Sequence, residues 1–178
     1  MKGIIFTEFL EMVERDYGFE TLNSIIDKSK LESNGIYSGV GTYDFQEFGQ
    51  LVKQLSLVTD LKENELLKKY GHYVFDTFYK NYGAFFANIE HPFQLLEQVD
   101  SHIHRDVKKL YPDAELPRFE TKRMGSGTME MLYSSKRRME YFALGLMEAS
   151  FIHFSINFSI NMEDKGNDTV LFTIKSTE

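Results

Sequence analysis

The fold is decided by an alternating stretch at residues 156–174, INFSINMEDKGNDTVLFTI. Apolar and polar side chains alternate on either side of the polar segment 164–168, with apolar positions at Ile156, Phe158, Ile160, Met162, Val170, Phe172 and Ile174. A period of two is typical of a strand that buries one face. Because a polar turn separates the two runs, the stretch predicts an antiparallel β-hairpin.

Two more strands and a helix are predicted upstream of this hairpin. Residues 118–123 and 128–134 surround Gly125-Ser126-Gly127, which is a hairpin signal. Residues 139–154 follow and are apolar along one helical side. The C-terminal part is therefore predicted to be an antiparallel sheet that carries one helix.

The chain before residue 112 has helical spacing instead. Four helices are expected in the first 80 residues, with apolar stripes at Phe6, Phe9, Leu10, Val13 and Tyr17, at Leu22, Ile25 and Ile26, at Phe45, Phe48, Val52 and Leu55, and at Leu67, Tyr70, Val74 and Phe78. Capping signals are expected at Asp44 with Glu47 and at Asp60 with Glu63. A fifth helix begins at Pro92 and ends before Pro112, with Leu96, Val99, Ile103, Val107 and Leu110 on one face. The fold class is α+β, with a helical N-terminal two-thirds packed on the sheet.

Composition narrows the class of protein. A length of 178 residues predicts one domain, and the absence of cysteine excludes disulfides, thiolate nucleophiles and cysteine metal sites. The net charge of -7 has the wrong sign for non-specific nucleic-acid binding. No apolar run is long enough for a membrane span, and the N-terminal apolar run is too short for a secretory signal. We expect a cytoplasmic protein that binds neither nucleic acid nor membrane.

His102 and His104 lie on the predicted fifth helix. Residues two apart on a helix point away from each other, so the pair cannot hold one ion. His104 lies at the edge of the apolar stripe beside Val107, whereas His102 lies on the far side. Residue pattern alone leaves two interpretations of His104 open and favours the first: a partly buried, hydrogen-bonded histidine, or an axial ligand to a large apolar cofactor such as haem.

The segment Tyr133-Ser134-Ser135-Lys136-Arg137 suggests an anion site. If the strand continues through it, Tyr133, Ser135 and Arg137 project from one face. Two hydroxyls and a guanidinium suit a carboxylate or phosphate. The alternative is a solvated basic strand end that leads into the following helix.

Other chemistries lack their motifs. The sequence has no phosphate-binding loop and no dinucleotide fingerprint, and Ser126 lies in a Gly-Ser-Gly turn rather than at a nucleophile elbow. We therefore predict no catalytic activity.

Four segments in order resemble the haem-nitric oxide/oxygen binding (H-NOX) family, which includes the haem domain of soluble guanylate cyclase. They are Met1-Lys2-Gly3-Ile4-Ile5, the run from His104 to Pro112 (HRDVKKLYP), Leu116-Pro117-Arg118-Phe119, and Tyr133-x-Ser135-x-Arg137. The resemblance covers essentially the whole chain. It implies a single haem-binding domain at 1–178, with a distal helical part at 1–62, a proximal part with the sheet at 63–178, and the haem between them.

The resemblance also implies residue roles. His104 would be the proximal ligand of haem b (iron protoporphyrin IX), since the spacing to Tyr111 selects it over His102. The remaining cofactor contacts it implies are the propionate-binding residues Tyr133, Ser135 and Arg137, the porphyrin-distorting Pro117, and the distal Ile5 and Phe142.

Phe142 bears on the choice of gas. Family members that bind oxygen stably carry a distal tyrosine at the position that aligns with Phe142, and Tyr141 is its neighbour. A pocket without this donor does not stabilise the charge that oxygen acquires on ferrous haem, whereas nitric oxide needs no such donor. The resemblance therefore implies a nitric oxide sensor that discriminates against oxygen, with carbon monoxide as a second ligand.

The expected output is a change of shape. In the family, nitric oxide weakens the bond between the iron and the proximal histidine, and the helix that carries His104 shifts. We expect a separate histidine kinase or cyclic-di-GMP enzyme to respond to this shift.

Three other interpretations compete with the sensor. They are a haem-free small-molecule-binding module of the vinyl-reductase-like type, a haem enzyme such as a peroxidase, and a purely structural interaction domain. The first does not require His104 together with Tyr133, Ser135 and Arg137. The second requires a distal acid–base residue that the sequence does not reveal. The third predicts a colourless protein.

Overall fold

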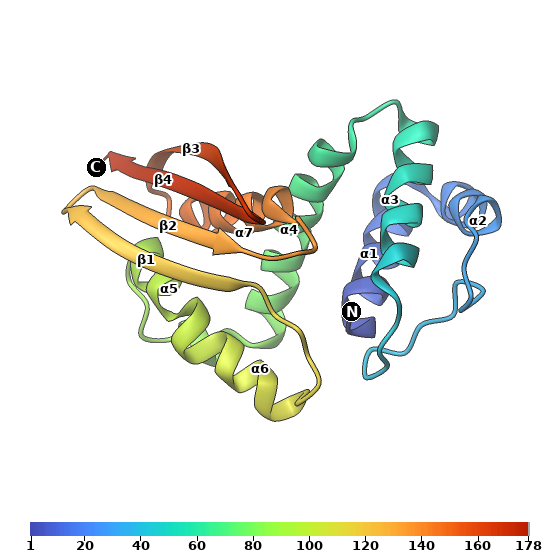
Figure 1. The fold of residues 1–178 in the computed structure, drawn as a ribbon, viewed down its shortest axis with the longest axis horizontal. Coiled ribbons are helices and arrows are strands. Elements are labelled where there is room, and N and C mark those ends of the chain that lie inside the picture. Colours follow the sequence, from blue (N-terminus) through green and yellow to red (C-terminus); the bar gives the residue numbers. More distant parts are fainter. Residues whose placement is uncertain (178) are drawn as a thin grey trace.

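The computed structural model describes residues 1–177, and all of their side chains except those of residues 84 and 85. Helices α1–α3 form one side of the molecule, the sheet with α5, α6 and α7 forms the other, and α4 lies between them (Figure 1). The elements in chain order are α1 (Gly3–Tyr17), α2 (Phe19–Lys28), α3 (Phe45–Thr59), α4 (Glu63–Asn81), η1 (Gly83–Phe86), α5 (Pro92–Gln98), η2 (Val99–Ile103), α6 (His104–Leu110), β1 (Arg118–Gly125), β2 (Thr128–Ser134), α7 (Glu140–His153), β3 (Asn157–Gly166) and β4 (Thr169–Thr177). No helix within residues 1–177 is both long and apolar enough to cross a membrane.

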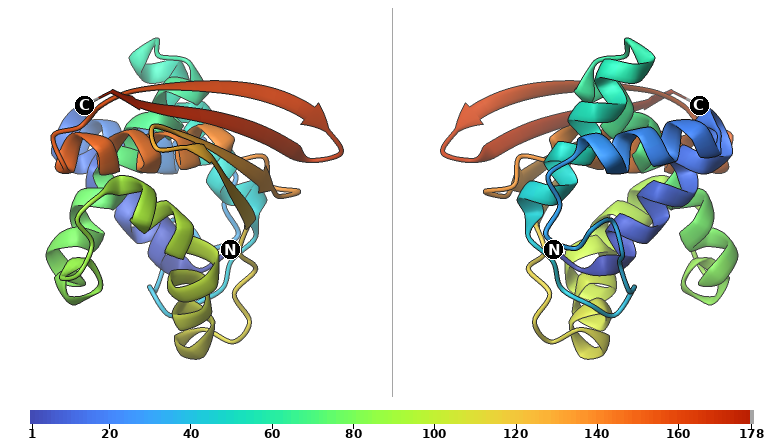
Figure 2. Two further views of the ribbon diagram at one scale, coloured as in Figure 1. Left: turned by 90° about the vertical axis from the view of Figure 1, so that its left-hand side faces the viewer. Right: turned by 90° about the vertical axis from the view of Figure 1, so that its right-hand side faces the viewer.

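The predicted sheet is confirmed. Its four strands within the described residues are antiparallel and follow the order β1-β2-β4-β3, so that β3 and β4 pair as the alternation predicts. Figure 2 shows α7 lying along the sheet. The inward-facing strand residues pack with residues of α5 and α7 in one core, which contains Phe93, Leu96, Met129, Met131, Tyr133, Ala143, Met147, Phe151, Val170, Phe172 and Ile174.

The four N-terminal helices are also confirmed, but only one of their two capping signals is correct. Asp44 Oδ1 accepts a hydrogen bond from the Gln46 N–H at 2.8 Å and caps α3. Asp60 instead ends α3 in a left-handed conformation with φ 58°. The chain needs two more residues to enter α4, whose start is capped by the Glu65 carboxylate accepting from the Lys62 N–H at 3.0 Å.

Glu47, expected to complete the first cap, has a different role. Its side chain is buried, and its Oε2 accepts hydrogen bonds from the hydroxyl of Ser33 and, at 2.7 Å, from that of Tyr37. A buried carboxylate is stable only when its acceptor positions are satisfied. Glu47 therefore holds the α2–α3 loop against α3.

The single helix predicted from Pro92 to Pro112 is wrong in its middle. A π-helical turn, η2, separates α5 from α6, and the His104 N–H donates to the carbonyl of Val99, five residues back. The wider turn rotates every following side chain relative to a regular helix. Leu110, expected on the buried face, is consequently 69% exposed.

Helices α4 and α7 cross at two glycines. A Cβ on Gly71 would lie 2.3 Å from the carbonyl oxygen of Phe142, and a Cβ on Gly145 would lie 2.0 Å from that of Lys68. Both distances are far below van der Waals contact. The two helices can approach this closely only because neither residue has a side chain.

We predict that Gly145→Ala lowers the free energy of unfolding by about 3 kcal/mol, because the new methyl group overlaps a backbone atom that cannot move alone. Urea unfolding of the purified variant measures this loss. Gly49→Ala is the control, since a Cβ on Gly49, an exposed residue within α3, meets nothing within 4 Å. The control is expected to gain about 0.4–1 kcal/mol. Equal stabilities of the two variants would contradict the close crossing.

Candidate functional site

His104 begins α6, directly after the π-helical turn. Its side chain is 17% exposed, and its Nδ1 lies 3.3 Å from Asp100 Oδ1. The Phe119 ring lies 5.7 Å from the imidazole, measured between ring centroids. His102, by contrast, is exposed, and its Nδ1 lies 2.8 Å from the Ser101 hydroxyl. The structure therefore separates the two histidines, as their spacing predicts.

Burial keeps the His104 imidazole in its neutral form. Loss of solvent lowers the pKa of His104 below its usual 6.5, and this effect outweighs the opposing influence of the Asp100 carboxylate and the Pro117 carbonyl. The neutral imidazole is the form that binds a metal ion. Pro117 thus lies beside His104, as a proximal residue would.

Asp100 was missed by the sequence reasoning. The signal was present, because a carboxylate four residues before a histidine can reach it on a helix. A second group on the free ring nitrogen of a metal-binding histidine orients the ring and raises its basicity. Asp100 is placed to act on His104 in this way.

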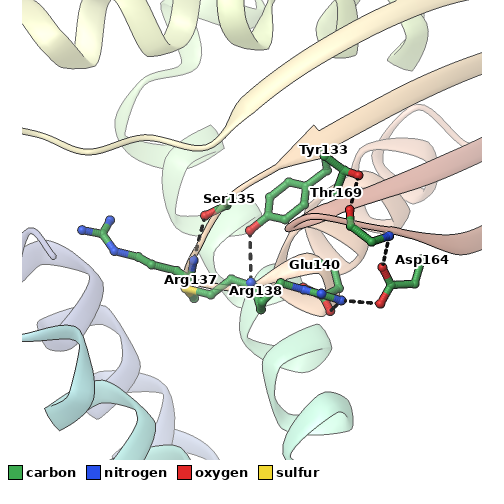
Figure 3. A network of polar contacts seen from close by, with 9 residues as sticks. Tyr133, Ser135, Arg137, Arg138, Glu140, Asp164 and Thr169 are labelled. Carbon is green, nitrogen blue, oxygen red and sulfur yellow. Dashed lines mark hydrogen bonds and ion pairs between the residues drawn. The ribbon is translucent and has the colours of Figure 1, made fainter.

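The strand interpretation of the segment after Tyr133 is wrong. Strand β2 ends at Ser134, and a turn closed by the Arg138 N–H donating to the Ser135 carbonyl at 3.2 Å follows it. Arg138 has φ 50° and forms ion pairs with Glu140 and Asp164. Strand alternation therefore does not place Ser135 and Arg137 on one face. The compact turn still brings Ser135 close to Tyr133 (Figure 3).

Tyr133 is anchored inside the sheet core. Its side chain is buried, and its hydroxyl accepts a hydrogen bond from the Met139 N–H at 3.0 Å. Burial raises the pKa of Tyr133, against the influence of the Ser135 hydroxyl and the Met139 amide. The phenol therefore stays protonated and retains its donor capacity. The Ser135 Oγ in turn accepts from the Arg137 N–H at 3.2 Å.

The Arg137 guanidinium already holds a carboxylate. It donates to Glu115 Oε2 at 2.5 Å and to the Glu115 carbonyl at 2.7 Å, and it lies 5.9 Å from the centroid of the Phe45 ring. Figure 3 shows the side chain extending away from Tyr133. Glu115 is 81% exposed, so another carboxylate can replace it at little cost. This partner was also missed, because Glu115 carries no sequence signal.

A polar cavity of about 340 Å³ adjoins Arg137. Residues from both sides of the molecule line it, namely Met1, Lys2, Thr42, Asp44, Phe45, Asp113, Ala114, Glu115 and Arg137. The charged groups of the cavity therefore come from the N-terminal segment, from the N-cap of α3, from the α6–β1 connection and from the turn after β2.

Ile5 and Phe142, the expected distal residues, are linked by Tyr70. The Tyr70 ring stacks on that of Phe142 with centroids 5.0 Å apart, and its hydroxyl donates to the Ile5 carbonyl at 2.7 Å. Tyr70 is fully buried, and burial raises its pKa well above 10, so the hydroxyl remains a donor. The sequence reasoning placed Tyr70 in an apolar stripe and did not anticipate this hydrogen bond.

The donor set fits haem. Within the described residues no three His, Asp or Glu side chains are grouped to hold a metal ion, whereas haem iron takes a single histidine. His104 provides a neutral imidazole, and Arg137 binds a carboxylate in the same way that it would bind a propionate. Ile5 and Phe142 add apolar surface. An α+β fold with these groups defines a haem-binding domain.

The family model described as Haem-NO-binding matches residues 2–162. The chain therefore belongs to the haem-NO-binding, or H-NOX, family. No curated protein sequence matches it.

Solved structures agree with this assignment. The Fe(II) unliganded H-NOX protein from K. algicida is 40% identical, with 100% of this chain and 97% of that chain covered and a TM-score of 0.94. The H-NOX from Shewanella woodyi, solved with IWP-051 in the Fe(II)CO state, is 36% identical, with coverages of 99% and 95% and a TM-score of 0.86. The S. oneidensis H-NOX protein in the Fe(II)NO state shares the fold at 23% identity, with both chains fully covered and a TM-score of 0.91.

Family membership confirms haem as the cofactor class and gas sensing as the class of function. H-NOX domains are haem-based sensor modules, and the solved relatives include nitric oxide and carbon monoxide states. The haem-free alternative is thereby disfavoured.

We predict that Tyr133→Phe lowers the free energy of unfolding by about 1–3 kcal/mol, because it leaves the buried Met139 N–H without an acceptor. Chemical unfolding followed by circular dichroism measures the change. Tyr17→Phe is the matched control, since the Tyr17 hydroxyl bonds only the exposed Lys69 amine among the contacts described, at 3.2 Å. The control is expected to change stability by less than about 0.5 kcal/mol.

Proposed function

We propose that this protein is a nitric oxide sensor that excludes oxygen and regulates a signalling protein through a ligand-driven conformational change. The observation that carries the proposal is that Tyr70, whose ring stacks on the distal residue Phe142, already donates its hydroxyl to the Ile5 carbonyl. The partner classes implied by the family resemblance are a histidine kinase and a cyclic-di-GMP enzyme. We expect no catalytic activity, and carbon monoxide is expected as a second ligand.

Seven residues would contact haem b. His104 would be the axial ligand of the iron, and Tyr133, Ser135 and Arg137 would bind the propionates. Pro117 would press on the proximal side of the macrocycle, while Ile5 and Phe142 would form the distal wall. When bound, haem supplies a ferrous iron whose distal face is open to a diatomic gas.

Selectivity follows from the hydrogen bond of Tyr70. Oxygen on ferrous haem acquires negative charge and needs a donor, which the Phe142 side chain lacks. The ring of Tyr70 stacks on that of Phe142, and the Tyr70 hydroxyl donates to the Ile5 carbonyl at 2.7 Å. Turning this hydroxyl toward a gas would break the hydrogen bond of a fully buried side chain, which is costly. Nitric oxide requires no donor and is not disfavoured.

The output would depend on α6. We propose residues 1–62 as a distal part and 63–178 as a proximal part, with His104 belonging to the latter. A change in the restraint on His104 would move α6 relative to the distal helices. A partner that binds one of the two arrangements more tightly responds to the gas through that difference in affinity.

We predict that His104→Gly loses haem during purification unless imidazole is added, because the variant lacks the side chain that would bind the iron. Absorbance at the haem band relative to protein absorbance measures the haem content. His102→Gly is the matched control, since His102 is exposed and contacts Ser101. Normal haem content in His104→Gly without imidazole would place the ligand elsewhere.

We predict that the haem band of the reduced wild-type protein shifts with nitric oxide but not with air, and that Phe142→Tyr adds a response to air. The added hydroxyl would supply the missing donor. Tyr141→Phe is the control and is expected to behave as the wild type. A stable response of the wild type to air would overturn oxygen exclusion, whereas a protein that takes up no haem would overturn the sensor.

A further inference from the structure

The N-terminal segment and the loop that follows α6 are joined by three polar side chains, Lys2, Thr42 and Asp113, which we call the Asp113 clamp. Lys2 Nζ lies 3.2 Å from Asp113 Oδ1 and donates to Thr42 Oγ1 at 2.9 Å. The Thr42 hydroxyl donates to Asp113 Oδ2 at 2.8 Å. Each member therefore contacts the other two, and Asp113 is the only one of the three beyond residue 62.

Lys2 is held firmly on its own side of the clamp. Its side chain is 12% exposed, its Nζ lies 5.2 Å from the centroid of the Tyr111 ring, and its backbone forms a β-bridge with Thr42. The next residue, Gly3, donates its N–H to the Gly41 carbonyl at 2.8 Å and begins α1. These contacts fix the Lys2 side chain relative to the start of α1. Asp113 therefore attaches to a rigid site at the start of α1.

Asp113 is attached just as closely to α6. It lies three residues after Leu110, the last residue of α6. A turn joins them, in which the Ala114 N–H donates to the Tyr111 carbonyl at 2.9 Å, and Ala114 itself is buried. Such a short, hydrogen-bonded connection allows little movement of Asp113 relative to α6. A movement of α6 must therefore move Asp113.

We propose that Asp113 is the residue that transmits a displacement of α6 to α1 through Lys2. The inference rests on the proposed function, because it takes a change at His104 as the origin of the displacement. Asp113 acts through Lys2 and is not among the residues proposed to contact haem or gas, so it is a coupling residue. Without its carboxylate, α6 moves and α1 does not follow.

Spin labels on the haem-loaded protein test this proposal. The chain has no native cysteine, so Glu14→Cys on α1 and Lys108→Cys on α6, both at exposed positions, provide a unique pair for labelling. Distances between the labels are measured in the reduced protein with and without nitric oxide. The haem absorption shift is recorded on the same samples.

We predict that Asp113→Asn enlarges the nitric oxide-induced shift in label distance by roughly twofold or more relative to the unaltered chain, because α6 moves and α1 no longer follows it. The haem absorption shift is expected to be unchanged. Asp106→Asn is the matched control, because Asp106 pairs with Lys109 and Arg105 of its own helix. Reversing the pair, with Lys2→Asp and Asp113→Lys together, is expected to restore the original distance shift.

Each other result overturns the inference. An unaltered distance shift in Asp113→Asn would show that the clamp transmits nothing, and an equal effect of Asp106→Asn would assign the change to charge alone. Failure of the reversed pair to restore the shift would exclude Lys2 as the partner. If nitric oxide leaves the haem absorption of the wild type unchanged, the proposed function itself fails, which the spectra distinguish from a failure of the clamp.

Discussion

The close crossing of α4 and α7 is the constraint on which the rest of the structure depends. Gly71 and Gly145 let the two helices approach until backbone atoms touch. Helix α4 then presents Tyr70 to the N-terminal helices, while α7 contributes Phe142 on that side and packs against the sheet on the other. Two cores that share no strand are thus joined by one helix pair. A larger residue at either glycine would separate the helices and, with them, the residues proposed for the distal and proximal sides of the haem.

Two buried tyrosines stabilise the backbone around this helix pair in complementary ways. The hydroxyl of Tyr70 donates to the carbonyl of Ile5 at the start of α1, and that of Tyr133 accepts from the N–H of Met139 before α7. Each ring contributes apolar burial, the Tyr70 hydroxyl adds a hydrogen bond to a carbonyl in the first turn of α1, and the Tyr133 hydroxyl satisfies an N–H at the beginning of α7. The same residues bear on ligand chemistry. The Tyr70 hydroxyl proton is donated to the Ile5 carbonyl and is not available to a gas, whereas the Tyr133 hydroxyl acts as an acceptor toward Met139 and keeps its own proton for donation.

Regular elements could be predicted from the sequence because their buried apolar residues recur with the period of a helix or a strand. The alternation from Ile156 to Ile174 yields the β3–β4 pair, and the family resemblance selects His104. Irregular backbone produces no such periodicity in the sequence. The π-helical turn before His104 and the turn after Ser134 depend on tertiary packing, so the expected face of Leu110 and the expected extension of β2 were wrong. Asp100, Glu115 and Tyr70 were missed for a related reason: their roles lie in contacts and not in spacing.

Two carboxylates in the connection between α6 and β1 form ion pairs with two cations from different parts of the chain. Asp113 meets Lys2 from the N-terminal segment, and Glu115 meets Arg137 from the turn after β2. A propionate bound to Arg137 would compete with Glu115, whose exposed carboxylate loses little on returning to solvent. The propionate would not disturb the ion pair between Lys2 and Asp113. Cofactor binding at Arg137 would therefore free Glu115 from the turn after β2, whereas Asp113 would still hold the connection that bears Pro117 to Lys2 and Thr42.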